Sequence, residues 1–194
     1  MIWSAVVKNV TKCYNFDMEN YDELWGYAED HFGMITVSEA KELGVPNAHL
    51  VMMERRGTLT RIGCGVYQVK HHVVGPNDAY AVAVAKVGEG AYLRGASVLG
   101  LLRIVPTDLG VYYVGIGRRC RKRLPDYIRL ADRTDAKVCM YEGIRCEELS
   151  EAIISAANDG ALDMDRILEA REESVERGLI DRDDAIRIAK EVRA

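Results

Sequence analysis

The sequence has no long hydrophobic run. None of its apolar stretches approaches the roughly 20 residues that a helix needs to cross a bilayer. Its start, MIWSAVVKNV, lacks both the long apolar segment and the small-residue cleavage site of a secretory signal. We therefore expect a cytoplasmic protein with no membrane partner.

The sequence also lacks the cysteine and histidine spacings of a metal site. Its five cysteines are scattered and form no C-x-x-C pair: Cys13, Cys64, Cys120, Cys139 and Cys146. His71 and His72 have no carboxylate at metal-ligand spacing. We expect buried or idle thiols, no bound metal and no cofactor.

No catalytic motif stands out. Ser97, Ser150 and Ser155 lie in helical patterns without the G-x-S-x-G turn that exposes a nucleophile. The glycines of 115-GIG-117 lack the G-K-[ST] ending of a phosphate loop and the third glycine of a dinucleotide turn. Asp163 and Asp165 stand near a helix start, where acids stabilise the helix dipole. The sequence predicts a protein that is not an enzyme.

What the sequence does have is enough apolar residues for a core, and an uneven charge. Its 194 residues are 48% hydrophobic, which suits one large or two small domains. The net charge is −4, and acids outnumber bases after Glu142. One run is basic: Arg118, Arg119, Arg121, Lys122 and Arg123. Such a run can hold phosphates or an acidic partner, although a charge run is more often a solvated face.

The N-terminal third contains the pattern of three short helices. The first is expected from residue 19 to Gly33, with an apolar stripe of Tyr21, Leu24, Trp25, Ala28 and Phe32. Residues 1–18 have few helix signals and are expected to form an N-terminal arm without an assigned role.

The second and third helices are marked by their ends. Thr36 and Glu39 have capping-box spacing, and Gly44 ends the second helix. The third is expected from Asn47 to about Arg56, with Leu50 and Met53 facing inward.

A β-hairpin follows the third helix. Its strands are 59-LTRI-62 and 66-VYQV-69, joined through 63-GCG-65. Three helices, a short turn and a hairpin in this order predict a winged helix-turn-helix over residues 19–72.

The remainder predicts a second, mixed domain over residues 77–194. The stretch 70-KHHVVGP-76 reads as a linker, after which Asn77 can cap a helix that ends at Val87. Another helix is expected within 95–104, strands within 111–117 and 137–143, and three amphipathic helices within 147–159, 163–178 and 181–193. The expected fold class is therefore α+β: a winged helix-turn-helix, then an α/β domain with a helical C-terminus.

Two motifs resemble the AbiEi family of antitoxins from bacterial viral-defence systems. The first is G-x-I-T-x-x-E-A-x-x-x-G-V, from Gly33 to Val45, continued by L-x-x-x-x-R-R-G-x-L-x-R-x-x-x-G-V-Y, from Leu50 to Tyr67. The second, less distinctive, is 90-GAYLRGASVLGLLRI-104. Together the resemblance covers roughly residues 21–158.

The resemblance implies a function. In AbiEi proteins the winged helix binds the promoter of the antitoxin–toxin operon, and the C-terminal domain contributes to repression and antitoxicity. The implied partners are double-stranded DNA with inverted repeats, read by a homodimer or by cooperative loading, and a nucleotidyltransferase-like toxin. The alternative is a protein-interaction module that neutralises such a toxin without binding DNA.

The third helix is the expected reading helix. In a helix-turn-helix, the second helix of the motif enters the major groove. The residues expected to contact DNA are Asn47, Ala48, His49, Met52, Arg55, Arg56 and Arg61. Arg55 suits a guanine edge, whereas Arg56 and Arg61 suit phosphates. Val51 and Met52 stand where relatives commonly have arginines, and can touch thymine methyls or pack on a neighbouring domain.

Overall fold

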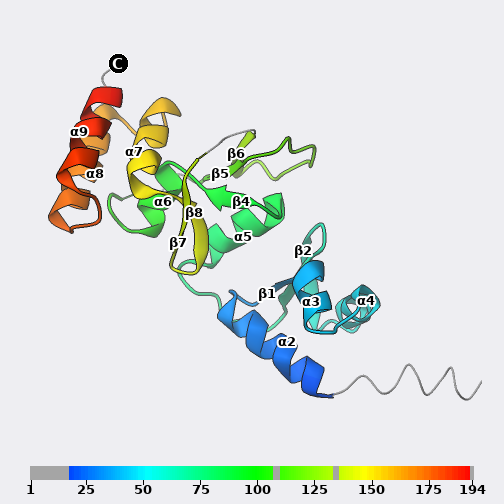
Figure 1. Ribbon diagram of the computed structural model, residues 1–194. Helices are drawn as coiled ribbons and strands as arrows, with labels where there is room; N and C mark the ends of the chain where they lie inside the picture. Colours follow the sequence, from blue (N-terminus) through cyan, green and yellow to red (C-terminus); the bar gives the residue numbers. More distant parts are fainter. Residues whose placement is uncertain (1–17, 107–109, 133–135, 193–194) are drawn as a thin grey trace, which may run out of the picture. The chain divides into compact units, whose positions relative to one another are not determined.

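The computed structural model describes residues 18–106, 110–132 and 136–192, and it divides the chain into two compact units, residues 1–74 and 75–194 (Figure 1). Helices and sheets occur in both units, so the predicted mixture of α and β structure is confirmed. The N-terminal arm expected over residues 1–18 lies outside the described residues, except that Met18 begins the first helix. Cys13 lies outside them as well.

The described part of the first unit, from residue 18 onward, contains three helices and a small antiparallel sheet. Its helices are α2 (Met18–Asp30), α3 (Val37–Glu42) and α4 (Asn47–Arg55). Its strands are β1 (Met34–Thr36), β2 (Leu59–Gly63) and β3 (Val66–Val69), in the order β1-β3-β2. The sequence reasoning did not predict β1, which places Ile35 opposite Tyr67 on β3.

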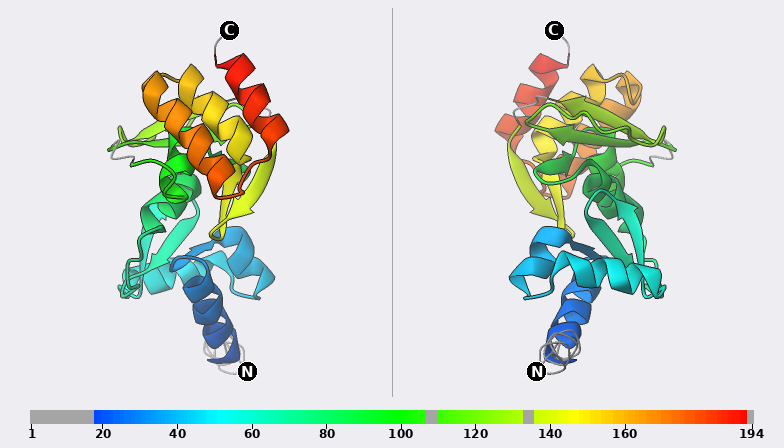
Figure 2. Two further views of the ribbon diagram at one scale, coloured as in Figure 1. Left: turned by 90° about the vertical axis from the view of Figure 1, so that its left-hand side faces the viewer. Right: turned by 90° about the vertical axis from the view of Figure 1, so that its right-hand side faces the viewer.

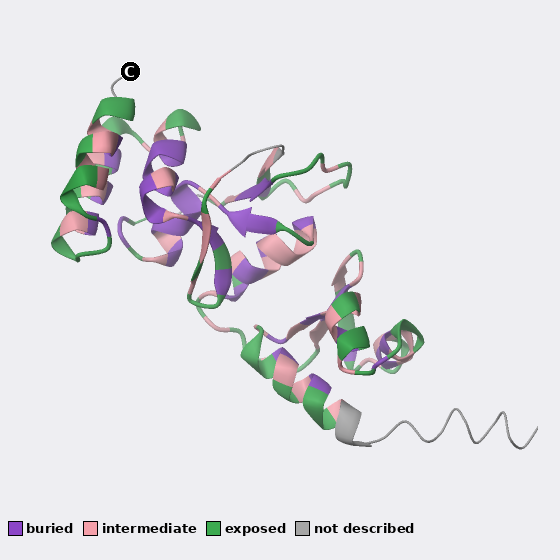
Figure 3. Cartoon of the chain, viewed as in Figure 1, coloured by how far each residue is buried: buried purple, intermediate pink, exposed green. Residues whose placement is uncertain are grey.

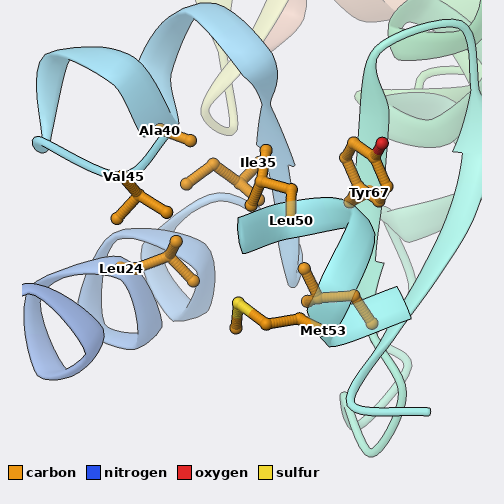
Figure 4. Close-up of a cluster of buried hydrophobic side chains, with 8 residues drawn as sticks. Leu24, Ile35, Ala40, Val45, Leu50, Met53 and Tyr67 are labelled. Atoms are coloured by element: carbon orange, nitrogen blue, oxygen red, sulfur yellow. The ribbon is translucent and has the colours of Figure 1, made fainter. Parts of the chain in front are cut away.

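One apolar cluster holds this unit together (Figure 4). It joins Leu24 of α2, Ile35 of β1, Ala40 and Val45 at α3, and Leu50 of α4, all with no exposed surface. The expected inward positions of α2 and α4 are therefore correct. Complete burial of a Leu or Ile side chain stabilises a fold by roughly 1.5–3 kcal/mol, so this cluster fixes how α4 is held.

The second unit is built on a five-stranded mixed sheet. Its strands are β4 (Ala91–Leu93), β5 (Tyr112–Ile116), β6 (Ile128–Asp132), β7 (Val138–Tyr141) and β8 (Ile144–Glu147), in the order β6-β5-β4-β8-β7. Two pairs, β5–β6 and β4–β8, are parallel, and the other two are antiparallel. The strands β4, β6 and β8 were not expected from the sequence.

Five helices accompany this sheet: α5 (Asp78–Val87), α6 (Ala96–Leu101), α7 (Leu149–Asn158), α8 (Met164–Glu176) and α9 (Arg182–Glu191). Figure 2 shows α7, α8 and α9 side by side. Asn77 occupies the N-cap position of α5 as expected, but its side chain makes no cap hydrogen bond. Instead, Oδ1 of Asp78 accepts a hydrogen bond of 3.0 Å from the Gly75 N–H.

None of the helices in the described ranges is long and apolar enough to span a membrane.

Candidate nucleic-acid interface

The start of α3 is held by a reciprocal pair of hydrogen bonds. The Glu39 N–H donates to Oγ1 of Thr36 at 3.2 Å, and the Thr36 N–H donates to Oε2 of Glu39 at 2.7 Å. Each bond satisfies a backbone donor that a helix start would otherwise leave unpaired. The capping box predicted from the sequence is confirmed.

The turn between α3 and α4 is set by Gly44. Its φ of +76° is a left-handed conformation that favours glycine. The Val45 N–H donates to Ala40 O at 2.7 Å and the Gly44 N–H donates to Lys41 O at 3.0 Å, which together make a Schellman motif. Val45 is thereby buried beneath the turn, and the chain re-enters a helix at Asn47.

The C-terminus of α4 repeats this arrangement. Gly57 has φ +77°, its N–H donates to Glu54 O at 2.9 Å, and the Thr58 N–H donates to Met53 O at 3.0 Å. The chain then passes directly into β2, so α4 is clamped at both ends by hydrogen-bonded turns. A helix of nine residues would be marginal in isolation, and here the turns and the buried face stabilise it.

The two faces of α4 differ sharply. Leu50 and Met53 are buried in the cluster, whereas Asn47, Ala48 and Arg55 are exposed. His49, Val51 and Met52 are half-buried. The spacing of Ala48, Met52 and Arg55 places them along one outward stripe, because residues four and three apart share a helix face.

The exposed cations lie at one end of α4 and on the hairpin. Arg55 and Arg56 end the helix, and Arg61 is exposed on β2, a strand that packs against α4. Nε of Arg61 donates to Gly63 O at 3.2 Å, next to an irregularity in the pairing of β2 with β3. Among the described residues, Arg55, Arg56 and Arg61 form no ion pair with a carboxylate, so their charges remain available.

Lys70 is a further cation of this surface that the sequence reasoning assigned to a linker. Its backbone N–H donates to Thr58 O at 3.0 Å, which continues the β2–β3 hairpin by one more bond. Its Nζ atom lies 3.5 Å from where a Cβ on Gly57 would stand, so the ammonium group sits beside the end of α4. The only sequence feature that indicated this placement of Lys70 was its position opposite the start of β2 in the hairpin register.

Tyr67 lies within the core. It is 2% exposed and packs with the cluster that contains Leu50 and Met53, so it supports α4 from beneath (Figure 4). A more remote support is Tyr27 on α2: burial raises the pKa of its hydroxyl, and hydrogen bonding to Glu39 raises it further. Tyr27 thus stays neutral at physiological pH and links α2 to the capping box of α3.

The basic run of residues 118–123 belongs to the other unit. It lies in the connection between β5 and β6, which are parallel neighbours and therefore need a crossover. Residues 117–127 form that crossover without a helix or strand, which leaves the cations on an exposed loop. All five basic residues of the run are exposed, and Arg118 donates to Glu89 O at 3.3 Å.

Neither surface, as far as its residues are described, has the grouped ligand side chains of a metal centre. Within the described ranges, no three His, Cys, Asp or Glu side chains come together as metal ligands would. Cys64 is exposed and Cys146 is buried, and burial raises the pKa of the Cys146 thiol to about 12.

Comparison with protein families found a match within the first unit. Residues 27–70 match the AbiEi antitoxin family of transcriptional regulators. The match begins within α2 and ends at Lys70, so it contains α3, α4 and all three strands of the first sheet. The resemblance to AbiEi proteins predicted from the motifs is thereby confirmed over these residues. No curated protein matches the chain.

Proposed function

We propose that the chain is a cytoplasmic, DNA-binding autorepressor and antitoxin of an abortive-infection operon, and that it has no catalytic activity. The observation that carries the proposal is the two-faced helix α4 inside the AbiEi-matching segment. Its inner residues Leu50 and Met53 are buried, whereas Asn47, Ala48 and Arg55 are exposed. Three further cations, Arg56, Arg61 and Lys70, are exposed as well. The order α2, β1, α3, α4, β2, β3 supports a winged helix-turn-helix, with β2 and β3 as the wing.

In this proposal α4 enters the major groove. Asn47, Ala48, His49, Met52 and Arg55 face the bases, and Arg55 binds a guanine edge through two hydrogen bonds. Arg56, Arg61 and Lys70 contact phosphates on either side of the groove. Two copies read inverted half-sites about 34 Å apart, either as a dimer or by loading cooperatively.

The test is binding to the DNA upstream of the chain's own operon, measured by gel shift and anisotropy across a salt series. Arg55→Ala is expected to cost about 1–3 kcal/mol and to relax the preference for the operator. Arg56→Ala is expected to weaken all sequences alike and to reduce the salt slope by about 0.9. Arg145→Ala is the matched control, because Arg145 is exposed on β8 in the other unit. Equal binding to unrelated DNA at low salt would contradict the proposal.

The basic run of residues 118–123 is proposed as a second phosphate-binding surface. The exposure of all five basic side chains on the β5–β6 loop supports this role, since their charges can reach a phosphate. Arg119→Ala combined with Arg121→Ala and Arg123→Ala is expected to reduce the salt slope without altering the preferred sequence. An unchanged salt slope would mean that these arginines are only solvated and contact no phosphate.

One observation favours a second function, a protein-binding module that neutralises a nucleotidyltransferase-like toxin. Val51 and Met52 give the exposed side of α4 apolar surface that a partner protein could cover. Rescue from the toxin by a chain carrying both Arg55→Ala and Arg56→Ala, together with no promoter repression by the parent chain, would support this function over DNA binding.

A further inference from the structure

The helices α8 and α9 form an antiparallel pair at the C-terminal end of the second unit, and both pack on α7 (Figure 2). Their inner faces are buried: Ile167, Ala170 and Ser174 on α8, and Ile188 on α9. Figure 3 shows burial running through α7 and exposure along the outer sides of α8 and α9. The pair is therefore attached on one side and open on the other.

A shallow groove with an apolar floor runs between the two helices. Toward the start of α8 the groove forms an open hollow of about 280 Å³. Toward the end of α8 it forms another, more open hollow of about 500 Å³. Its apolar lining comprises Met164, Leu168, Val175, Ile186, Ala189 and Val192. Ile186 is 53% exposed and Met164 is 48% exposed. Large aliphatic side chains this open to water, aligned along a groove, are typical of a binding surface.

Three arginines at this pair of helices bond outside the groove, whereas Arg171 and Arg182 line it. Arg166 donates to Pro106 O at 2.5 Å, and Arg177 donates to Leu102 O at 3.1 Å. Arg187 bonds to Glu151 at 2.5 Å and to Ser150 at 2.8 Å, both on α7. These positive charges are used to attach the pair to the rest of the unit.

The acids of α8 are left on the outside. They line a further hollow of about 440 Å³ beside Leu168: Asp165, Glu169, Glu172, Glu173 and Glu176. Glu172 pairs with Arg171 and Glu173 approaches Arg177. Asp165, Glu169 and Glu176 make no ion pair within the described part of the chain. On α9, the other side of the groove carries both signs of charge: Asp183 and Glu191 line a hollow together with Arg187 and Lys190.

We propose that the α8–α9 groove is a docking site for an amphipathic helix of a partner protein, one whose apolar stripe is flanked by lysines or arginines. Such a helix would add to α7, α8 and α9 as the last member of a four-helix bundle, with its apolar stripe on the groove floor. Its flanking cations would meet the acids of α8. A second copy of this groove is a poor occupant, because its α8 would bring further acids in place of cations.

This docking site goes beyond the proposed function, since it concerns helices outside the AbiEi-matching residues and needs no DNA. The groove specifies the chemistry of the partner helix, which is apolar in the middle and basic at its edges.

The test uses the full chain and a synthetic helical peptide of about 18 residues, which is long enough to cover α8. The peptide carries leucines at i, i+3, i+4 and i+7 with lysines on both flanks. One control peptide has the same composition in an order that breaks the helical period, and another has glutamates in place of the lysines. Binding is followed by fluorescence anisotropy and located by NMR shift changes in the labelled chain.

The amphipathic basic peptide is expected to bind, with shift changes on α8 and α9, whereas both controls bind at least tenfold more weakly. Ile186→Ser is expected to raise the Kd about tenfold, as the loss of one buried aliphatic contact would. Met140→Ser is its matched control, since Met140 is 62% exposed on β7, outside the groove. Glu169→Gln with Glu176→Gln is expected to flatten the salt dependence, and Glu142→Gln, also exposed, is not.

NMR shift changes outside α8 and α9 would overturn the proposal. So would equal binding of the control peptide whose order breaks the helical period, or an unchanged Kd in the Ile186→Ser chain. So would sedimentation showing a dimer that Ile186→Ser dissociates, because the occupant would then be a second copy. DNA binding by the Ile186→Ser chain, measured separately, is expected to equal that of the parent. A failure of operator binding alongside normal peptide binding would therefore count against the proposed function alone.

Discussion

Thr36 and Glu39 show how much one pair of side chains contributes to the placement of α3. The two hydrogen bonds of their capping box satisfy backbone donors, and Thr36 also pairs with Val66 across the sheet. Glu39 additionally contacts Tyr27 of α2. One local motif thus ties a helix start, a strand end and a second helix together.

Thr36→Ala is expected to destabilise the first unit by about 1 kcal/mol, because the Glu39 N–H loses its acceptor. Thr36→Ser keeps the hydroxyl and is expected to remain close to the parent. Urea denaturation followed by circular dichroism measures both, with Ser38→Ala, exposed on the same helix, as the control. Equal losses for Thr36→Ala and Ser38→Ala would mean that the cap contributes nothing.

Glu147 is a buried carboxyl group of the second unit. It is 4% exposed, Oε2 accepts from the Gly95 N–H at 3.0 Å, and Oε1 accepts from the Ser155 hydroxyl at 2.8 Å. Arg94 donates to Ser155 and pairs with Asp159 at 3.0 Å, which completes a network between α6, α7 and β8. Burial raises the pKa of Glu147 above its ordinary value of 4.5, and the hydrogen bonds and Arg94 offset this only in part.

A raised pKa gives this carboxyl group a definite effect on stability. The folded chain holds the Glu147 proton more tightly than the unfolded chain does. The contribution of this proton to the free energy of unfolding is therefore fully present below pH 4.5. The contribution is lost as the pH rises through the folded-state pKa. Glu147→Gln is expected to remove that loss, so the difference in unfolding free energy between parent and variant should vary with pH. Glu89→Gln, exposed, should show no such variation.

The helix α4 carries the candidate interface because its ends and its inner face are determined separately. Schellman turns at Gly44 and Gly57 set its length, and Leu50 and Met53 set its rotation. Its outer positions are consequently free to vary without loss of the fold. Under the proposed function, this separation of supporting from contacting residues would allow one helix frame to read different DNA sequences.

Met52→Arg is expected to strengthen DNA binding at low salt and to steepen the salt slope by about 0.9, because it adds one cation to the outward stripe. Met52 is half-buried, so the long arginine stem can lie over the same surface. Anisotropy across a salt series measures the slope. Met140→Arg adds the same charge on β7 and should leave the slope unchanged; a steeper slope in both variants would indicate a general charge effect.

The chain as a whole consists of two units with separate cores. The cluster around Leu50 involves only residues of the first unit, and the second is built around its own sheet and helices. Between them, Val73 and Val74 are 86% and 78% exposed, although both are apolar. A segment that neither core covers is the natural site of proteolysis.

Elastase, which cuts after small apolar residues, is expected to cleave first after Val73 or Val74 among the sites in the described residues. Two stable fragments should result, and mass spectrometry identifies their ends. Val73→Glu combined with Val74→Glu should slow this cut without changing the melting temperature. A first cut inside either unit would show that one of the cores opens more readily than the connection.

Much of the first unit was predictable from short stretches of sequence. The capping box, the glycines after two helices and the i, i+3 apolar positions each act within a few residues, so their physics is visible in the chain itself. The same holds for the amphipathic stripes of α7, α8 and α9. The exposure of Arg55 follows from the same periodicity, whereas the use of Arg55, Arg56 and Arg61 as DNA contacts stays a prediction.

The strands that were missed are those whose partners are distant in sequence. Both β1 and β4 have three residues, too few for an alternating pattern, and they exist because β3, β5 and β8 offer them hydrogen bonds. The residues of β6 were not recognised as a strand, and parallel pairing with β5 makes them one. The place of Lys70 beside Gly57 depends in the same way on the hairpin register.

Local sequence therefore determined where helices begin and end, and which of their sides are apolar, since these depend on neighbours within one or two turns. Tertiary structure alone decided that β1, β4, β6 and β8 form, which carboxyl groups are buried, and which apolar side chains stay uncovered. Those outcomes depend on contacts between residues tens of positions apart, as in the α8–α9 groove, where an ordinary amphipathic pattern leaves Ile186 and Met164 open to a partner.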